Sequence, residues 1–262
     1  MQIPLFPLHT VLSPGLALPL HVFEDRYRLM VRRCVDESVP FGVVLIHEGS
    51  EVAPRGGAPH ELAIASVGTF AEIREASRYA DGRWELLTVG AGRFVIETVK
   101  TGIEPYLVAE VEPLDDALGD AETAEALVRR VSRRFVAYLR LLQPRDGEDA
   151  TPIDVQVELD VPEDDVAADE EDDEAIDELD AQDGPAGLAE ALRIPDDPSH
   201  LSFLLTGILQ VEPFRKQALL EATTAEQRLR ELDRILDREL MLLRARLAPY
   251  HPDRRALGPL AS

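Results

Sequence analysis

Residues 3–31 read IPLFPLHTVLSPGLALPLHVFEDRYRLMV, and this stretch separates an export signal, a membrane anchor and a folded β domain. Its first half is apolar, uncharged and interrupted by Pro4, Pro7, Pro14 and Pro19. A secretory signal carries positive charge before its apolar core, but the first Lys or Arg here is Arg26. The prolines would also break the continuous helix of a signal or anchor. We therefore interpret the stretch as the first strands of a folded domain.

The composition predicts a soluble globular protein. The chain has 262 residues, of which 45% are hydrophobic, so it can bury a sizeable core. No segment approaches the ~18 uninterrupted apolar residues of a spanning helix, so we predict no membrane association. Cys34 is the one cysteine, which excludes an intramolecular disulfide and suits a reducing compartment. We predict a cytoplasmic protein in which Cys34 packs as a small buried hydrophobe.

The acidity of the chain is concentrated in one segment. The net charge is −23, and residues 146–192 contain 20 Asp or Glu and no Lys or Arg. Because 20 of the 23 excess negative charges lie there, the rest of the chain carries only −3. The segment has too few apolar residues to offset the entropy of ordering, so we predict a solvated acidic linker or insertion. The spacing of Ile176 and Leu179 allows one short helix within it.

The same segment has three alternative readings. It could bind cations, mimic nucleic acid or dock on a basic partner. It lacks the loop pattern of an EF-hand, which disfavours organised calcium binding. The remaining surface shows no broad basic face that would attract nucleic acid.

The first 113 residues carry mostly strand signals. Five segments are rich in β-branched and aromatic residues, at 41–47, 62–76, 83–90, 92–99 and 106–113. Gly and Pro separate them, and we predict a turn at Gly90-Ala91-Gly92. Short strands separated by Gly and Pro residues predict a compact, mainly antiparallel barrel or sandwich.

Two segments show the three-to-four-residue apolar spacing of helices. The first covers about residues 24–36, with its apolar positions at Tyr27, Met30, Val31, Cys34 and Val35. We expect it to plug or flank the barrel. The second begins at Asp120, a good N-cap, and runs to about residue 142.

The C-terminal part predicts a small helical bundle. Asp197 can cap a first helix, and Pro213 occupies the start of a second. Thr223 and Glu226 form a capping-box pattern ahead of a long helix that ends before Pro249. Leucines recur along this last helix at spacings of three and four residues, as expected for packing on the two preceding helices.

These signals predict an α+β chain of five parts. They are a β domain at 1–115, a connecting helix at 116–145, the acidic linker at 146–192, a helical bundle at 193–249 and a tail at 250–262.

The stretch at residues 3–31 resembles the start of the N-terminal, substrate-binding domain of Lon protease. The usual pattern of that family reads approximately L-P-L-F-P-L-x-x-V-L-x-P-G-x-x-L-P-L-x-[IV]-F-E-x-R-Y. Later elements follow in order: FGVVLI, Val67-Gly68-Thr69, Gly92-Arg93-Phe94, PYLVAEVEPL and KQALLEATTAEQRLREL. The resemblance covers residues 2–113 and the helices near 121–142 and 196–247, and only the acidic stretch lies outside it. It implies a PUA-like β pseudobarrel followed by α-helices.

The sequence lacks the catalytic motifs of the complete protease. It contains no G-x-x-x-x-G-K-[ST] loop for nucleotide phosphates. The DGPAG sequence at 183–187 echoes the protease's nucleophile motif but has Ala186 where a serine is needed. We therefore predict a standalone LON-domain protein without ATPase or protease domains, with no cofactor and no catalytic residue.

The six histidines show no metal-site spacing, so we predict no metal site. The candidate binding residues instead lie on the exposed face of the first helix and beside the Asp81-Gly82 hairpin. They are Glu24, Asp25, Arg28, Arg32, Tyr79 and Trp84. Structural roles compete with this reading, because Glu24 suits the positive end of a helix dipole and Trp84 suits packing at a sheet edge.

The resemblance implies a noncatalytic module that recognises protein segments, including unfolded ones. Binding would use the groove between the β domain and the helical bundle, and the module would act as an adaptor for a separate ATP-dependent protease or chaperone. One alternative is an RNA-binding PUA-like protein. Its basic patch would come from two clusters, Arg129, Arg130, Arg133 and Arg134, and Arg32 and Arg33. Another is an enzyme of unrecognised type that uses the same groove.

Overall fold

A computed structural model describes residues 1–48, 63–142, 156–158, 191–193 and 195–247. The chain forms two compact units. The first comprises Met1–Val128 and Pro195–Leu232, and the second comprises the described residues of Arg129–Ile194 and Asp233–Ser262. Each unit is considered separately below.

Strands precede helices along most of the chain. The strands are β1 (Gln2–Leu8), β2 (Ala17–Val22), β3 (Phe41–Glu48), β4 (Ala63–Ile64), β5 (Val67–Arg78), β6 (Trp84–Lys100), β7 (Val108–Leu114), β8 (Gln156–Glu158) and β9 (Ala191–Arg193). The helices are α1 (Asp25–Glu37), α2 (Ala121–Leu142), α4 (Pro198–Ile208), α5 (Pro213–Glu221) and α6 (Ala225–Leu247).

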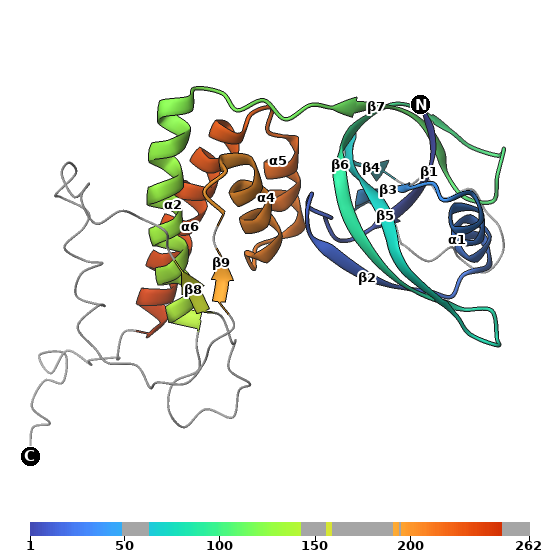
Figure 1. Ribbon diagram of the computed structural model, residues 1–262, viewed down its shortest axis with the longest axis horizontal. Coiled ribbons are helices and arrows are strands. Elements are labelled where there is room, and N and C mark those ends of the chain that lie inside the picture. The colour runs from blue at the N-terminus through green and yellow to red at the C-terminus, as the bar shows by residue number, and fades with distance from the viewer. Residues whose placement is uncertain (49–62, 143–155, 159–190, 194, 248–262) are drawn as a thin grey trace, which may run out of the picture. The chain divides into compact units, whose positions relative to one another are not determined.

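Strands β1 to β7 form the predicted barrel, which Figure 1 shows beside α1. Neighbouring strands run in the order β1-β7-β6-β5-β3, and each of these pairs is antiparallel. A parallel pairing of β1 with β3, from Leu5–Gly42 to Leu8–Leu45, closes the ring. Strand β2 pairs with β6, and the short β4 pairs with β3. The expected α+β class, with a β-rich first part and C-terminal helices, is confirmed.

The turn predicted at Gly90-Ala91-Gly92 is wrong. These residues lie inside β6, a single strand of 17 residues that carries a bulge opposite β5 between Thr69 and Ala71. The position requires glycine for a different reason, because the backbone of residues 14–16 packs directly against the strand there. Gly90 N donates to Leu16 O at 3.0 Å, and a Cβ on Gly90 would lie 2.5 Å from Ser13 O. The glycine permits close backbone approach rather than a turn.

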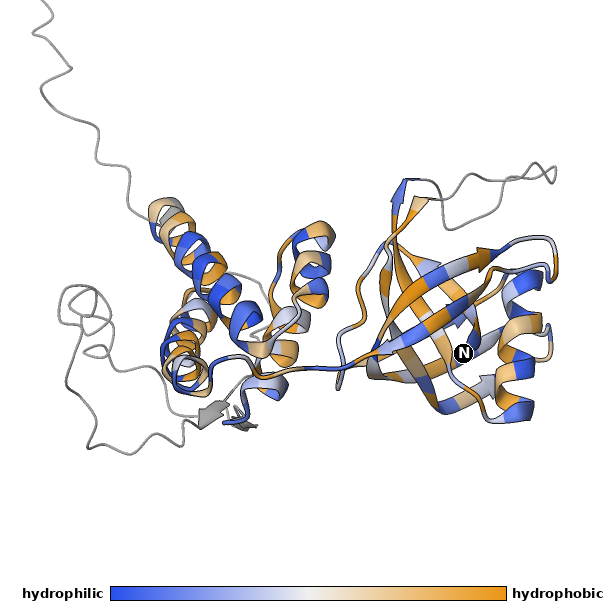
Figure 2. Ribbon diagram, turned by 90° about the horizontal axis from the view of Figure 1, so that it is seen from above, coloured by the Kyte–Doolittle hydropathy of each residue, from blue (hydrophilic) through white to orange (hydrophobic). Residues whose placement is uncertain are grey.

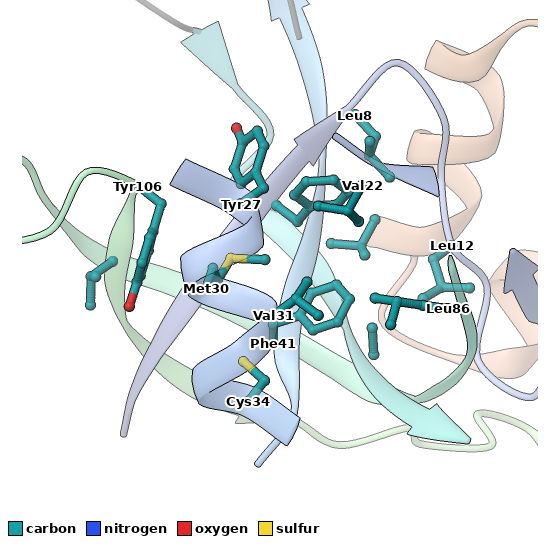
Figure 3. Close-up of a cluster of buried hydrophobic side chains, with 14 residues drawn as sticks. Leu8, Leu12, Val22, Tyr27, Met30, Val31, Cys34, Phe41, Leu86 and Tyr106 are labelled. Atoms are coloured by element: carbon teal, nitrogen blue, oxygen red, sulfur yellow. The ribbon is translucent and has the colours of Figure 1, made fainter. Parts of the chain in front are cut away.

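Helix α1 confirms the helix predicted at residues 24–36. Its side chains at Tyr27, Met30, Val31 and Cys34 are buried against barrel residues such as Phe41 (Figure 3). The rings of Phe6 and Tyr27 meet edge-to-face with centroids 4.4 Å apart. The helix therefore flanks the barrel and buries one face, while its other face carries hydrophilic residues (Figure 2).

Cys34 has the predicted packing role, and its thiol should be unreactive in the folded protein. It is 1% exposed, and burial raises the pKa of the thiol from its ordinary 9.0 to about 11. Because the thiolate is the reactive form, we expect native protein at pH 8 to resist the thiol reagent DTNB, whereas urea-unfolded protein reacts at once. Absorbance of the released thionitrobenzoate measures both rates. Fast labelling without denaturant would contradict this packing.

Two of the predicted helix caps are confirmed. The Asp120 carboxylate accepts a hydrogen bond from Thr123 N at 2.9 Å, and the Asp197 carboxylate accepts one from His200 N at 2.8 Å. Pro213 is the first residue of α5, as expected. Each cap satisfies a backbone donor that the first helical turn leaves without a partner.

The capping box predicted from Thr223 to Glu226 is displaced by one residue. Thr224 Oγ1 accepts the hydrogen bond from Gln227 N at 3.1 Å, while Thr223 donates to the side chain of Gln227. A bridge between Thr224 and Ala117 determines this register, because the passing chain holds the start of α6 one residue later. The error arises from a contact with a distant segment that local spacing does not report.

In the first unit, the barrel and α4 and α5 share a buried contact. Val67, Phe203 and Leu220 form an apolar cluster, and Gln217 Nε2 donates to Val67 O at 3.0 Å. Beside it lies a charged cluster, which we call the arginine pair, made of Arg93, Arg228 and their shared carboxylate Asp116. The two guanidinium groups are buried, and both contact the Asp116 side chain. A mixed apolar and ionic contact thus connects the strands to the helices.

In the second unit, α2 and α6 are joined by ion pairs. Asp233 contacts both Arg130 and Arg134 at 2.9 Å. Strands β8 and β9, which the sequence did not predict, pair in parallel over three residues. Most of the acidic linker lies outside the described residues, as do the helical turn predicted at Ile176 and Leu179 and the tail at 250–262. Within the described part of the chain, no helix is long and apolar enough to cross a membrane.

Candidate functional site

The β5–β6 hairpin forms one wall of the candidate site. Tyr79 N donates to Arg83 O at 2.9 Å, and the Asp81 carboxylate accepts from the backbone N and side-chain Nε of Arg83. These hydrogen bonds lower the pKa of Asp81 and hold the turn in one conformation. Gly82 has φ +88, a backbone conformation that favours glycine.

Arg28 of α1 connects the helix to this hairpin. Its Nε donates to Gly82 O at 2.7 Å, and its Nη2 donates to Asp81 O at 3.3 Å. Its Nη1 donates to Asp25 Oδ1 at 2.9 Å, so the guanidinium is oriented from both sides. A Cβ on Gly82 would lie 1.8 Å from Arg28 Nη2, which is a second reason for glycine there. The helix and hairpin are therefore held at a defined separation.

Between them lies an open depression of about 190 Å³. Helix α1 lines it with Asp25, Arg28, Leu29 and Arg32, and the hairpin lines it with Arg78 and Trp84. Leu29 is 49% exposed although it is a large apolar residue. The Arg78 guanidinium lies over the Trp84 ring, 5.8 Å from the ring centroid. The depression therefore presents apolar and cationic groups together.

Two further exposed aromatic side chains lie on the other face of the sheet, because they contact Glu85 and His21, which point away from the side of Trp84. Tyr79 is 43% exposed in the hairpin, and its hydroxyl donates to Glu85 Oε2 at 2.5 Å. Phe23 is 54% exposed and follows Val22, the register partner of Trp84. We call the surface made by Leu29, Trp84 and the other residues that line the depression the α1–hairpin face.

The structure brings most of the candidate binding residues together. Asp25, Arg28, Arg32 and Trp84 line the depression, whereas Tyr79 belongs to the same hairpin but bonds Glu85 on its opposite face. Glu24 instead pairs with Arg26 at 3.1 Å and makes no side-chain cap to α1. The sequence prediction omitted Leu29 and Arg78. The signal for Leu29 was present, because it is a large apolar residue outside the buried stripe of its helix.

Comparison with known families identifies the chain. The family model of the ATP-dependent protease La (LON) substrate-binding domain matches residues 2–238. The chain belongs to this family. Its relatives include Lon protease 2 of Myxococcus xanthus, 24% identical over 244 residues, and the Lon protease of Syntrophus aciditrophicus, 24% identical over 248 residues. Each match covers 92% of this chain but 24% and 25% of the relative, so the chain spans about a quarter of their length.

Solved LON-domain structures share the fold. A Lon N-terminal domain protein from Xanthomonas campestris aligns with a TM-score of 0.53 at 22% identity, over 88% of this chain and 96% of that one. The N-terminal domain of the Mycobacterium avium complex Lon protease aligns with a TM-score of 0.54 at 19% identity, over 90% and 98% of the two chains. The β-rich part followed by helices is therefore the architecture of LON N-terminal domains.

Where the barrel of this LON domain meets α4 and α5, the described side chains pack closely. Arg93 Nη1 donates to Leu220 O at 2.7 Å and to Ala222 O at 2.6 Å, beside the apolar cluster of Val67, Phe203 and Leu220. These contacts give the described residues there a structural role in packing the barrel against the helices. The binding groove expected between the β domain and the bundle stays a prediction.

The arginine clusters of the RNA-binding alternative are engaged with carboxylates. Three of their arginines form closer ion pairs, namely Arg33 with Glu37, and Arg130 and Arg134 with Asp233, whereas Arg32 lies 3.6 Å from Asp36 in an exposed, weaker pair. Paired guanidinium groups contribute less to phosphate neutralisation than free ones. Among the residues described for this LON domain, no three His, Cys, Asp or Glu side chains are grouped as metal ligands.

Proposed function

We propose that this LON-domain chain is a noncatalytic recognition module that binds exposed polypeptide segments through its α1–hairpin face. The observation that carries the proposal is a depression that presents an apolar side chain from each of its two walls, Leu29 of α1 and Trp84 of the hairpin. Leu29 is 49% exposed although it is a large apolar residue. Contiguous exposed apolar surface is characteristic of binding sites rather than of inert surface. The family description, a substrate-binding domain, supports the same role.

The size of the depression favours a polypeptide over a small molecule. Its volume of about 190 Å³ lies below the roughly 300–1,000 Å³ typical of small-molecule and cofactor sites. A cavity of this size accommodates one side chain, and a peptide supplies side chains in series. The Arg28 hydrogen bonds to the hairpin keep both walls in place before binding, which reduces the ordering cost of association.

The wider role that we propose is that of an adaptor. The relatives that the chain matches are named Lon proteases, and the shared region is their substrate-binding part. The module binds unfolded or exposed segments in the cytoplasm and presents them to an ATP-dependent protease or chaperone. The barrel of residues 1–115 provides the α1–hairpin face in this arrangement, and the helical bundle of residues 193–249 supports it through the buried contact with α4 and α5.

Substitution of Leu29 tests the proposed face. Trp84 is the one tryptophan of the chain and lines the depression, so its fluorescence reports occupancy there. A short Trp-free peptide of Leu, Gln and Gly should shift the emission of Trp84 on titration. Leu29→Asp should weaken this binding about tenfold, as truncation of a central apolar contact in an interface typically does.

Met241→Asp is the matched control, because Met241 is 65% exposed on α6 and does not line the depression. It should leave the titration unchanged. Peptide binding detected by anisotropy without any response of Trp84, and unaltered by Leu29→Asp, would place the binding surface elsewhere.

A further inference from the structure

The depression carries an excess of positive charge in a strongly acidic chain. Three arginines and one aspartate line it, whereas the chain as a whole has a net charge of −23. Arg28 is committed to Asp25 and to two hairpin carbonyls. Its role is therefore structural, and the other two arginines determine what the depression attracts.

Arg32 and Arg78 have weak local partners. Arg32 Nε lies 3.6 Å from Asp36, and both side chains are about two-thirds exposed, so water competes with this pair. Arg78 contacts the Trp84 ring, and across the described ranges no carboxylate lies within ion-pair distance of it. Both guanidinium groups keep hydrogen-bond donors for a ligand.

These two cations come from the two walls of the depression. Arg32 lies on α1, one turn after Leu29, and Arg78 ends β5 beside Trp84. Each wall thus combines an apolar side chain with a guanidinium group. A ligand that satisfies both walls needs an apolar side chain with negatively charged groups on either side.

We infer that the α1–hairpin face prefers acidic-apolar polypeptide segments, in which a Leu-like side chain enters the depression and flanking Asp or Glu carboxylates pair with Arg32 and Arg78. This inference rests on the proposed function and specifies its substrate class. Planar guanidinium groups match carboxylates in geometry as well as in charge. Two weakly paired cations can neutralise only a few phosphates, so the counterion-release contribution that dominates binding to a phosphate backbone would be small. A peptide is therefore favoured over RNA.

The preference can be measured with three matched Trp-free peptides. They share the same leucines, which are flanked by Glu, by Gln or by Lys, and Trp84 emission reports binding of each. The Glu peptide should bind about fivefold or more tightly than the Gln peptide, because each exposed ion pair contributes about two- to fivefold. The Lys peptide should bind most weakly. Raising the salt from about 50 mM to about 500 mM should remove most of the difference through screening.

Charge removal should abolish the discrimination without abolishing binding. The double variant Arg32→Gln and Arg78→Gln should bind the Glu peptide no better than the Gln peptide. Arg74→Gln is the control, because Arg74 is exposed on β5, pairs with Glu72 and does not line the depression. Circular dichroism of each variant verifies the fold.

The outcomes distinguish this inference from the proposed function. Equal affinity for the Glu and Gln peptides would overturn the acidic preference and leave polypeptide binding intact. Binding of none of the peptides would overturn the proposed function and the preference with it. An oligouridine RNA that binds more tightly than the Glu peptide, and loses affinity in the double variant, would overturn the peptide assignment in favour of nucleic acid.

Discussion

Replacing Asp116 with alanine should lower the free energy of unfolding by about 3–4 kcal/mol. The reason is that Asp116 is the shared carboxylate of the arginine pair. Its oxygens lie 2.7 and 2.9 Å from Arg228 Nη2, and Oδ1 lies 3.0 Å from Arg93 Nη2. Arg228 is fully buried and Arg93 is 2% exposed, so water cannot replace the carboxylate as a hydrogen-bond partner of either guanidinium group. The Asp116 side chain is itself 22% exposed, which places the loss in the lower part of the range for breaking a buried ion pair.

The arginine pair has other contacts that limit the loss. The Arg228 guanidinium lies over the Phe203 ring at 3.7 Å, and its Nε donates to Ser202 Oγ at 2.8 Å. Arg93 donates to three backbone carbonyls, those of Leu220, Ala222 and Asp115. Burial lowers the pKa values of both arginines, and the Asp116 carboxylate acts in the opposite direction by favouring their charged forms.

Urea unfolding followed by circular dichroism measures the effect. Asp116→Asn should lose less than Asp116→Ala, because the amide oxygen still accepts one hydrogen bond. Asp115→Ala is the matched control, since Asp115 contributes only its backbone carbonyl to Arg93. If Asp115→Ala and Asp116→Ala destabilised the protein equally, the ionic contact would not be a source of stability.

Phe94→Ala should lower the free energy of unfolding by about 3–5 kcal/mol, the usual loss for a buried phenylalanine. Phe94 is fully buried in the barrel beside Phe70, with ring centroids 4.9 Å apart. Its ring also occupies the space above two glycines. A Cβ on Gly42 would lie 2.6 Å from Phe94 Cζ, and one on Gly68 would lie 2.5 Å from it. Val99→Ala, an exposed change in the same strand, should stay within about 0.5 kcal/mol of the parent protein.

The contact between Phe94 and Gly42 should appear as energetic coupling. Gly42→Ala alone should cost about 1–3 kcal/mol, because the added methyl group overpacks the barrel. In the Phe94→Ala background the same change should cost clearly less, since the nearest obstructing atom is gone and the other close atoms are ends of the Leu5 and Ile3 side chains. Urea unfolding of the parent protein, the two single variants and the double variant measures this coupling. If the two losses in free energy of unfolding were strictly additive, the Phe94 ring would not be the reason why residue 42 must be glycine.

Local pattern predicted part of the α1–hairpin face. The helical spacing placed Asp25, Arg28 and Arg32 on the exposed side of α1, and the Asp81-Gly82 pair marked the turn. The omission of Leu29 and Arg78 has a physical cause. Whether an apolar or basic residue lines a depression depends on which element packs opposite it. Here the hydrogen bonds from Arg28 to Gly82 and Asp81 position the hairpin opposite α1.

The sequence by itself determined the class of the fold, most strand and helix positions and the caps at Asp120 and Asp197, because these follow from backbone preferences over a few neighbouring residues. Only the tertiary structure decided the parallel closure of β1 on β3, the continuity of β6 across Gly90 and the burial of Arg93 and Arg228 on Asp116. In sequence, Arg228 resembles any polar residue of an amphipathic helix. Its burial depends on Phe203 and Asp116, which are 25 and 112 residues away, and local chain preferences carry no information about contacts at that separation.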